Sequence, residues 1–356
     1  MTKQTLPTRC ITMQKNEAVL LEPWLLHHAA LFGFDALTVL DNGSDNPAVL
    51  DTLKRYEARG VTVIHDYPTK EDYGRKGEIV ADIIREWDRR GGYAFALPLD
   101  CDELLITVTE RIAWDRASVH AALARMAGQK STFVNNRMLL NIPHRPGYFR
   151  PQIIQRAIFA ADTITSLDQG YHFPGTIYPD RCGQSLLACL HLHNRPNYED
   201  IKTVARNKLR HLTGEADLAT MEPTEEGYHL YSYFRTSEET FLSQYRDQPD
   251  VYIPGILPYL ESLGIDWRPM LGTGGVQLPL RPPHNFLVHR AEHREQRHIF
   301  ETYDAAYYAA HNPDVVADPH YGLWPLAHFL PTGWNEGRRP NGLSQPPVIV
   351  EQMSAD

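Results

Sequence analysis

The chain has 356 residues and a net charge of −9, with 42% hydrophobic and 22% charged residues. This composition indicates a globular protein with a sizeable core, and the acidic balance excludes a general nucleic-acid binder, which would present a basic face. No stretch approaches the roughly 20 consecutive apolar residues of a membrane-spanning helix, and residues 1–7 hold no apolar signal-peptide core. The four cysteines lack C-x-x-C spacing and fit a reducing compartment. We therefore expect a cytoplasmic protein without a transmembrane segment, at most peripheral to the inner face of the membrane.

Strands and helices are predicted to alternate over the first hundred residues. Short apolar runs predict strands at 9–13, 36–40, 61–64 and 94–99. Between them, apolar residues recur at intervals of three and four and predict helices at 18–32, 47–59 and 78–89. This order predicts an α/β fold with a Rossmann-like, mostly parallel sheet and helices on both faces.

Polar residues follow each predicted strand at its carboxyl end. They are Lys15-Asn16-Glu17, Asp41-Asn42, Asp66 and Asp100-Cys101-Asp102. Since the carboxyl ends of parallel strands share one edge of a sheet, these loops would meet over one site. On an extended chain Asp100 and Asp102 would point the same way, and two converging carboxylates suit Mg²⁺ or Mn²⁺. A solvated turn with capping acids is the alternative for these acids alone, but four loops in phase favour a ligand site.

These motifs, in this order and at this spacing, resemble a bacterial family 2-type glycosyltransferase over about residues 8–215. The resemblance rests on Lys15-Asn16-Glu17 before an amphipathic helix, on the turn at 41–45, and on the D-x-D-E sequence at 100–103. Pro23 departs slightly from the pattern. The resemblance implies a GT-A-like nucleotide-diphospho-sugar transferase fold, a nucleoside-diphosphate sugar donor, with a UDP-sugar favoured, and a divalent cofactor, Mn²⁺ or Mg²⁺.

The same resemblance implies which residues bind the donor. Asn16, Glu17 and Asp41 match positions that hold the base and ribose. Arg75 and Lys76 lie where a basic residue often meets the donor, and a metal with such a cation would stabilise the diphosphate leaving group. For Lys76, a solvated charge at the start of a helix is the alternative.

The metal site would have two halves. Asp100 would approach the ribose or the sugar and the metal, and Asp102 would ligate the metal. The alternating run at 187–194 predicts a short strand with His191 and His193 on one face. The resemblance places a histidine ligand this far along the chain, with His193 favoured over His191 and the reverse order left open. Carboxylate and imidazole ligands suit Mn²⁺ better than Ca²⁺.

The acceptor is expected to bind over residues 131–179, which contain aromatic side chains suited to stacking on sugar rings. An inverting transferase, the mechanism we favour, needs a carboxylate base. Asp168 and Asp180 lie in this stretch and are the candidates, although neither belongs to a motif and each is also explained as a loop residue. A retaining enzyme would need no such base.

Four segments are expected along the chain. Residues 1–270 form the catalytic domain, with a helix at 198–211 whose basic residues, Lys208 among them, face solvent. Pro- and Gly-rich residues 271–297 form a linker. Residues 298–341 resemble a small helical module of bacterial surface-polysaccharide and secreted proteins, with the sequences Asn312-Pro313-Asp314-Val315 and Glu336-Gly337-Arg338. Residues 342–356 form a disordered tail.

The function these features predict is a metal-dependent hexosyl- or related glycosyltransferase of polysaccharide biosynthesis. It would move a sugar to a glycan, polysaccharide or lipid-linked acceptor. A glycoside hydrolase is the enzymatic alternative, because paired carboxylates also cleave glycosides, and it would need neither metal nor nucleotide. A carbohydrate-binding or scaffold protein with a transferase-like fold is the non-enzymatic alternative.

Overall fold

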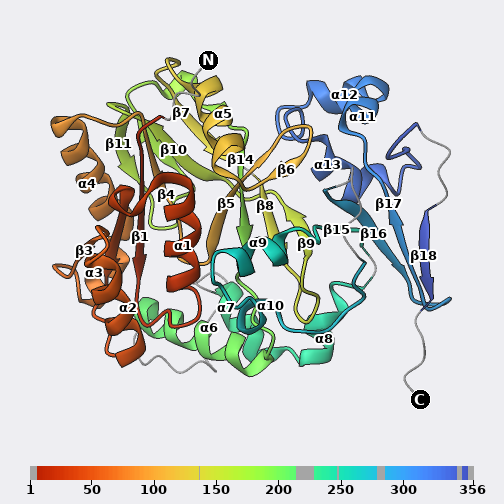
Figure 1. The fold of residues 1–356 in the computed structure, drawn as a ribbon, viewed down its shortest axis with the longest axis horizontal. Helices are drawn as coiled ribbons and strands as arrows, with labels where there is room; N and C mark the ends of the chain where they lie inside the picture. Colours follow the sequence, from red (N-terminus) through yellow and green to blue (C-terminus); the bar gives the residue numbers. More distant parts are fainter. Residues whose placement is uncertain are drawn as a thin grey trace.

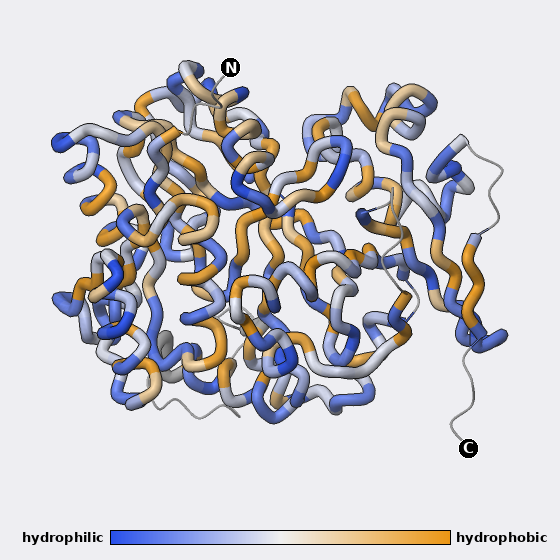
Figure 2. The backbone as a smooth tube through the Cα atoms, viewed as in Figure 1, coloured by the Kyte–Doolittle hydropathy of each residue, from blue (hydrophilic) through white to orange (hydrophobic). Residues whose placement is uncertain are grey.

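The computed structural model describes residues 6–135, 137–213, 228–246, 248–278, 285–342 and 347–351. Two β-sheets lie side by side, with helices packed around them (Figure 1). Both sheets have a hydrophobic interior, whereas hydrophilic residues concentrate in the loops (Figure 2). None of the helices in the described ranges is long and apolar enough to cross a lipid bilayer.

The first sheet confirms the predicted α/β class. Its strand order is β13-β7-β10-β4-β1-β2-β3, and β4, β1, β2 and β3 are mutually parallel. The strands are β1 (Thr8–Gln14), β2 (Leu37–Asp41), β3 (Thr62–Ile64), β4 (Phe95–Pro98), β7 (Thr132–Asn135), β10 (Arg156–Ala160) and β13 (Gly183–Gln184). Helices α1 (Leu21–Phe32), α2 (Pro47–Glu57), α3 (Lys70–Gly74) and α4 (Lys76–Arg90) connect the parallel strands. The sequence therefore predicted this part of the fold well.

Helices cover both faces of the parallel strands. Successive strand residues point to opposite faces. Cys10 packs in one core cluster with Trp24 of α1 and Leu53 of α2, whereas Ile11 packs in another with Ile84 of α4. Helices α1 and α2 therefore lie on one face and α4 on the other.

The second sheet was not predicted. It has the order β18-β17-β16-β15-β9-β8-β14-β5-β6, and among these pairs only β14–β8 is parallel. The chain enters it through the turn between β4 and β5. The strands are β5 (Glu103–Val108), β6 (Ile112–Ala113), β8 (Met138–Asn141), β9 (Tyr148–Gln152), β14 (Leu187–His191), β15 (Asp250–Tyr252), β16 (Leu287–Glu292), β17 (Arg297–Glu301) and β18 (Val348–Glu351).

The remaining elements surround the two sheets. A hairpin of β11 (Ile164–Leu167) and β12 (Pro174–Thr176) packs near α4. The other helices are α5 (Arg116–Met126), α6 (Tyr198–Thr213), α7 (Tyr228–Arg235), α8 (Glu238–Ser243), α9 (Ile256–Ser262), α10 (Arg268–Leu271), α11 (Ala305–His311), α12 (Pro313–Ala317) and α13 (Pro325–His328). Short helical turns lie at Phe34–Ala36, Pro179–Arg181 and Phe329–Gly333.

The C-terminal third differs from the expected linker and tail. The expected linker, 271–297, contains β16, and the expected tail, 342–356, contains β18; both belong to the second sheet. Strands of four to six residues that follow a Pro- and Gly-rich stretch or lie near the chain end escape pattern analysis, because so few residues carry little periodicity. Parts of both segments, 279–284, 343–346 and 352–356, lie outside the described residues.

The helical module at the C-terminus uses its motif residues internally. The Arg338 guanidinium donates to Asp314 Oδ2 at 2.8 Å and to Asn312 Oδ1 at 2.9 Å, so the two halves of the motif hold each other. Trp324 and Phe329 are buried and belong to the main hydrophobic core. Arg137 also donates to the backbone oxygen of His320 at 2.7 Å. The module thus packs onto the rest of the protein.

Gly77 allows α4 to approach the end of β11 closely. A Cβ at this position would lie 2.3 Å from the backbone oxygens of Leu167 and Asp168, whereas a Cβ at Gly74 of α3 would meet nothing within 4 Å. We predict that Gly77→Ala lowers the free energy of unfolding by about 1–3 kcal/mol through overpacking. Gly74→Ala, the matched control, should be neutral or slightly stabilising. Urea unfolding followed by circular dichroism measures both, and equal effects of the two substitutions would contradict this packing.

Candidate functional site

A cavity of about 980 Å³ opens where the two sheets meet. Its wall includes the loop after β1 (13–17), the acidic turn after β4 (100–102), the loop 168–172 and the end of β14 with the following residues (191–194). Helices α6, α7 and α8 complete it. The cavity therefore lies beyond the carboxyl ends of β1 and β4, where parallel sheets commonly bind ligands.

The acidic turn does not keep an extended conformation. Strand β4 ends at Pro98. The backbone N–H of Glu103 donates to the backbone oxygen of Asp100 at 3.0 Å, and this hydrogen bond closes a turn. The expectation that Asp100 and Asp102 share one face of a strand is therefore wrong. Asp100 contacts Lys76 and Asp102 faces His191, yet one carboxylate oxygen from each of Asp100, Asp102 and Glu103 lies within 4.8 Å of the others. The carboxylates therefore still converge, and Asp100 as a metal ligand stays a prediction.

Asp100 is held between two cations. Its Oδ1 accepts from Lys76 Nζ and its Oδ2 from Arg156 Nη2, both at 2.8 Å. Burial raises the pKa of Asp100, but these two cations outweigh it and hold the pKa at about 2. Lys76 is only 5% exposed, so the alternative of a solvated charge at a helix start is wrong.

Arg156 is the residue at this site that sequence reasoning missed. It opens β10 and donates from Nε to Glu103 Oε1 at 2.7 Å and from Nη1 to the Gly170 oxygen at 2.8 Å. Glu103 is fully buried, and burial raises its pKa even though Arg156 opposes the shift. A basic residue at the head of the apolar run 157–160 is the one signal that could have indicated this role.

Asp102 faces two histidines. Its Oδ2 lies 3.7 Å from His191 Nε2 and 3.9 Å from His193 Nδ1, and one potential ligand atom from each residue lies within 4.8 Å of the others. The ladder between β5 and β14 produces this arrangement. It pairs His191 with Glu103, and the Leu192 N–H donates to the backbone oxygen of Asp102 at 2.7 Å. Both imidazoles reach the carboxylate, so neither order of His191 and His193 is preferred.

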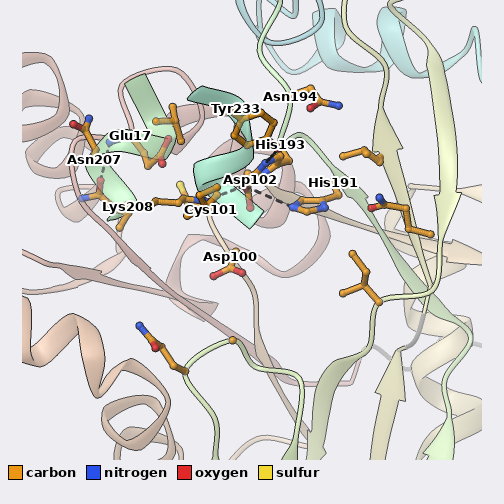
Figure 3. A pocket seen from close by; sticks show the side chains of 18 of the residues that line it. Glu17, Asp100, Cys101, Asp102, His191, His193, Asn194, Asn207, Lys208 and Tyr233 are labelled. Atoms are coloured by element: carbon orange, nitrogen blue, oxygen red, sulfur yellow. Dashed lines mark hydrogen bonds and ion pairs between the residues drawn. The ribbon is translucent and has the colours of Figure 1, made fainter. Parts of the chain in front are cut away.

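Lys208 lies on the opposite side of Asp102 (Figure 3). Its Nζ is 3.8 Å from Asp102 Oδ2, and it lines the cavity. The expectation that Lys208 faces solvent is therefore wrong: α6 turns this side chain toward the acidic turn. Burial raises the pKa of Asp102, but Lys208 and His191 outweigh it, so the pKa lies well below its usual range.

The donor set of Asp102, His191 and His193 fits a transition-metal ion. The hydroxyl of Tyr233 lies 3.0 Å from His193 Nε2 and orients the ring so that Nδ1 faces Asp102, as outer partners of metal-bound histidines do. Burial lowers the pKa of His193 to about 4, so its ring is neutral at pH 7 and can offer a lone pair. One carboxylate and two imidazoles suit Mn²⁺ better than Ca²⁺.

Two of the residues expected to bind the base and ribose line the cavity. Asn16 has a φ of 57°, and its side-chain oxygen accepts from the backbone N–H groups of Asp45 and Asn46 at 3.0 and 2.9 Å. Glu17 lies 3.5 Å from Arg195, and burial raises its pKa. Asn16 thus fixes the loop that presents Glu17 to the cavity.

Asp41 and Arg75, which were also expected to bind the donor, lie outside the cavity wall. Asp41 is 3% exposed, and its Oδ1 accepts from Gln14 Nε2 at 2.8 Å and from the Ser44 hydroxyl at 2.5 Å. Arg75 is exposed and pairs with Glu78 at 2.8 Å. Neither lines the cavity. Asp41 shapes the neighbouring loop, and Arg75 belongs to the surface of α4.

The two candidate bases also differ. Asp168 lines the cavity, and its oxygens accept from the backbone N–H groups of Gly170 at 3.0 Å and Phe173 at 2.5 Å. Asp180 is exposed in the short helical turn after β12 and does not line the cavity. Only Asp168 is therefore placed to meet a ligand there.

Comparison with known proteins adds little. No family model matches the chain, and no curated protein matches it. Among solved structures, residues 1–349 of S. aureus TarS in complex with UDP-GlcNAc share 11% identity at a TM-score of 0.32, over 81% of this chain and 97% of that one. A cytidylyltransferase from Leptospira borgpetersenii shares 9% identity at a TM-score of 0.27, over 44% of this chain and 61% of that one. These similarities are weak, and the fold rests on the topology described above.

Removing Arg156 tests the charge balance of the acidic turn. We predict that Arg156→Ala lowers the free energy of unfolding by about 3–5 kcal/mol, because it leaves Glu103 buried without its cation. Arg89→Ala, which removes an exposed arginine of α4, should leave the urea unfolding midpoint unchanged. A loss for Arg156→Ala no larger than that of the control would show that Glu103 does not depend on it.

Proposed function

We propose that this protein is a metal-dependent glycosyltransferase that moves a sugar from a nucleoside-diphosphate donor to a glycan, polysaccharide or lipid-linked acceptor. The observation that carries the proposal is the convergence of Asp102, His191 and His193 beside Lys208 in one cavity. The preference for a UDP-sugar rests on the resemblance of the D-x-D-E turn to family 2-type enzymes. The cytoplasmic location stays a prediction.

The residues would divide the work as follows. Asp102, His191 and His193 would hold Mn²⁺ or Mg²⁺, which would neutralise charge on the diphosphate leaving group. The Lys208 ammonium would bind a phosphate oxygen from the other side of Asp102. Asp100, kept ionised by Lys76, would accept a hydroxyl of the ribose or the transferred sugar.

The nucleoside would lie against the loop after β1. Glu17 would accept a hydroxyl or base N–H, and Asn16 would keep that loop in place. Asp41 would support the loop from behind rather than touch the donor. In an inverting reaction Asp168 would take the proton of the acceptor hydroxyl.

The hydrolase alternative is less well supported by the charges. A glycosidase needs one carboxylic acid that is protonated near neutral pH. Lys76 and Arg156 hold Asp100 ionised, and Lys208 and His191 do the same for Asp102, so a hydrolase would have to use Glu17, whose pKa burial raises, as its acid. A scaffold without activity would gain nothing from burying this many ionised groups in one cavity, since such groups cost stability.

Calorimetric titration tests the metal site. We predict that UDP binds in the presence of Mn²⁺ and that EDTA abolishes binding. Asp102→Asn or His193→Ala should weaken Mn²⁺-dependent UDP binding by roughly tenfold or more, since even outer partners of metal ligands are worth that much. Asp51→Asn, on the exposed face of α2, is the control and should bind as the unmodified protein does. Equal UDP affinity with Mn²⁺ and with EDTA would contradict the proposal.

Turnover distinguishes the two candidate bases. We predict that Asp168→Asn lowers the rate of transfer by roughly 10²–10⁴-fold, the usual contribution of a general base. Asp180→Asn should lower it by less than a factor of two, because Asp180 lies outside the cavity. The assay is release of UDP from a UDP-sugar with acceptor present, after circular dichroism has shown that both variants are folded. The opposite ranking would assign the base to Asp180.

A further inference from the structure

The cavity has a charged half and an uncharged half. The charged half holds the acidic turn, the two histidines and Lys208. The other half is built by β8, β9, α7, α8 and the residues directly after α8. None of the described residues that these elements contribute to the wall is charged; they include Leu140, Gln152, Tyr233, Thr240, Phe241 and Gln244. Amide, hydroxyl and aromatic groups are the groups that bind uncharged polyols.

Gln152 is the polar group of this half that lacks a partner. Its side-chain oxygen is buried and accepts no hydrogen bond from the described residues. A buried amide oxygen without a donor costs stability. The oxygen is closed to solvent in this structure, so the amide of Gln152, which lines the cavity, would turn this oxygen toward a ligand that supplies the donor. A sugar hydroxyl can donate to the amide oxygen and accept from the amide nitrogen, whereas an ionised phosphate or carboxylate can only accept.

Aromatic rings form another part of the wall. The centroids of Tyr233 and Phe241 lie 5.7 Å apart, and those of Phe241 and Tyr245 lie 5.8 Å apart. Tyr233 also reaches His193, with a distance of 3.0 Å from its hydroxyl to Nε2. A sugar that packs against Tyr233 would therefore lie directly beside the proposed metal site.

This wall is held in place by the second sheet. Arg150 of β9 donates to the backbone oxygens of Gln244 at 2.7 Å and Tyr245 at 3.3 Å. Buried Asp250 fixes Arg150 in turn, at 2.8 Å from Nη2. Asn194 donates to the Tyr245 hydroxyl at 2.9 Å. The end of α8 is thus tied to the sheet before any ligand binds, which lowers the entropic cost of binding.

We propose that the uncharged half is the acceptor subsite, that it takes an uncharged sugar residue, and that Gln152 determines this specificity. The inference rests on the proposed transferase function. In the reaction, an acceptor hydroxyl oxygen forms a bond to the anomeric carbon of the donor sugar. The bond from that carbon to the diphosphate oxygen breaks, its electron pair leaves with UDP, and the hydroxyl proton goes to a carboxylate, for which Asp168, on the wall of the same cavity, is the candidate. An acceptor with a phosphate or carboxylate at this unit would face the uncharged groups of Gln152 and Phe241 and is expected to bind more weakly than an uncharged sugar.

The subsite replaces the acceptor region expected from the sequence. Among the aromatic residues of the range 131–179, Tyr148, Phe149 and Tyr171 are buried in the core. Gln152 and His172 of that region do line the cavity, but the aromatic wall comes from α7 and α8.

The test measures UDP release by the full chain with Mn²⁺ and UDP-glucose, UDP-galactose or UDP-GlcNAc, with and without acceptor probes. The probes are methyl glucoside and methyl galactoside, paired with methyl glucuronide and glucose 6-phosphate. We expect uncharged probes to accelerate UDP release. Charged probes should leave the rate of UDP release as it is without any acceptor probe. Charged probes that accelerate it as much as uncharged ones would overturn the inference while leaving the transferase function intact. An absence of both UDP binding and UDP release would overturn both.

Gln152→Met separates binding from packing. Because the Gln152 oxygen has no partner among the described residues, the apolar substitution should not lower Tm. It should raise the acceptor KM by roughly tenfold, the equivalent of one hydrogen bond. Gln129→Ala, at the exposed end of α5, is the control and should leave the acceptor KM as it is. An unchanged acceptor KM in Gln152→Met, or a fall in Tm with no change in KM, would overturn the role of Gln152.

Discussion

The antiparallel ladder between β5 and β14 is the constraint on which the site depends. It places His191 opposite Glu103, and it includes the hydrogen bond from the Leu192 N–H to the backbone oxygen of Asp102. Two segments far apart in the chain thereby bring one carboxylate and two imidazoles together. A shift of one residue in this register would turn the histidines to the other face of the sheet. The crossing of the chain from β4 into β5 is equally necessary, because it carries the acidic turn from the parallel sheet to this ladder.

The three carboxylates of the acidic turn have different cationic partners. Asp100 and Glu103 are neutralised from inside the protein by Lys76 and Arg156, whereas Asp102 faces the cavity with Lys208 and the histidines. Buried charges cost stability unless they are paired, so Lys76 and Arg156 set the shape of the turn, while Asp100 and Asp102 both line the cavity and remain available to a ligand. This division explains how three adjacent acids can serve different purposes. It also places the charged half of the cavity next to a wall that carries no charge.

Local patterns in the sequence were sufficient for the four parallel strands of the first sheet. The strands and helices around β1 to β4 have clear periodicity, and the polar residues that follow β1 and β4 do meet at one cavity, although Asp41 stays behind the loop. The alternation at 187–194 placed both histidines on one face. The roles of Arg156 and Lys208 could not be predicted, because they depend on which elements pack against the acidic turn. Strands β16 and β18 were missed because they derive much of their stability from pairing with neighbouring strands and not from local propensity.

The central claim is that Asp102, His191 and His193 hold a metal ion that contacts the diphosphate. Pulsed electron paramagnetic resonance of the protein with one equivalent of Mn²⁺ and UDP tests it most directly. We expect hyperfine coupling of the Mn²⁺ spin to imidazole ¹⁴N and to ³¹P of UDP in the same sample, with the ¹⁴N coupling reduced in His191→Ala and in His193→Ala. A spectrum with ³¹P coupling but no ¹⁴N coupling, or ¹⁴N coupling that neither substitution changes, would contradict it.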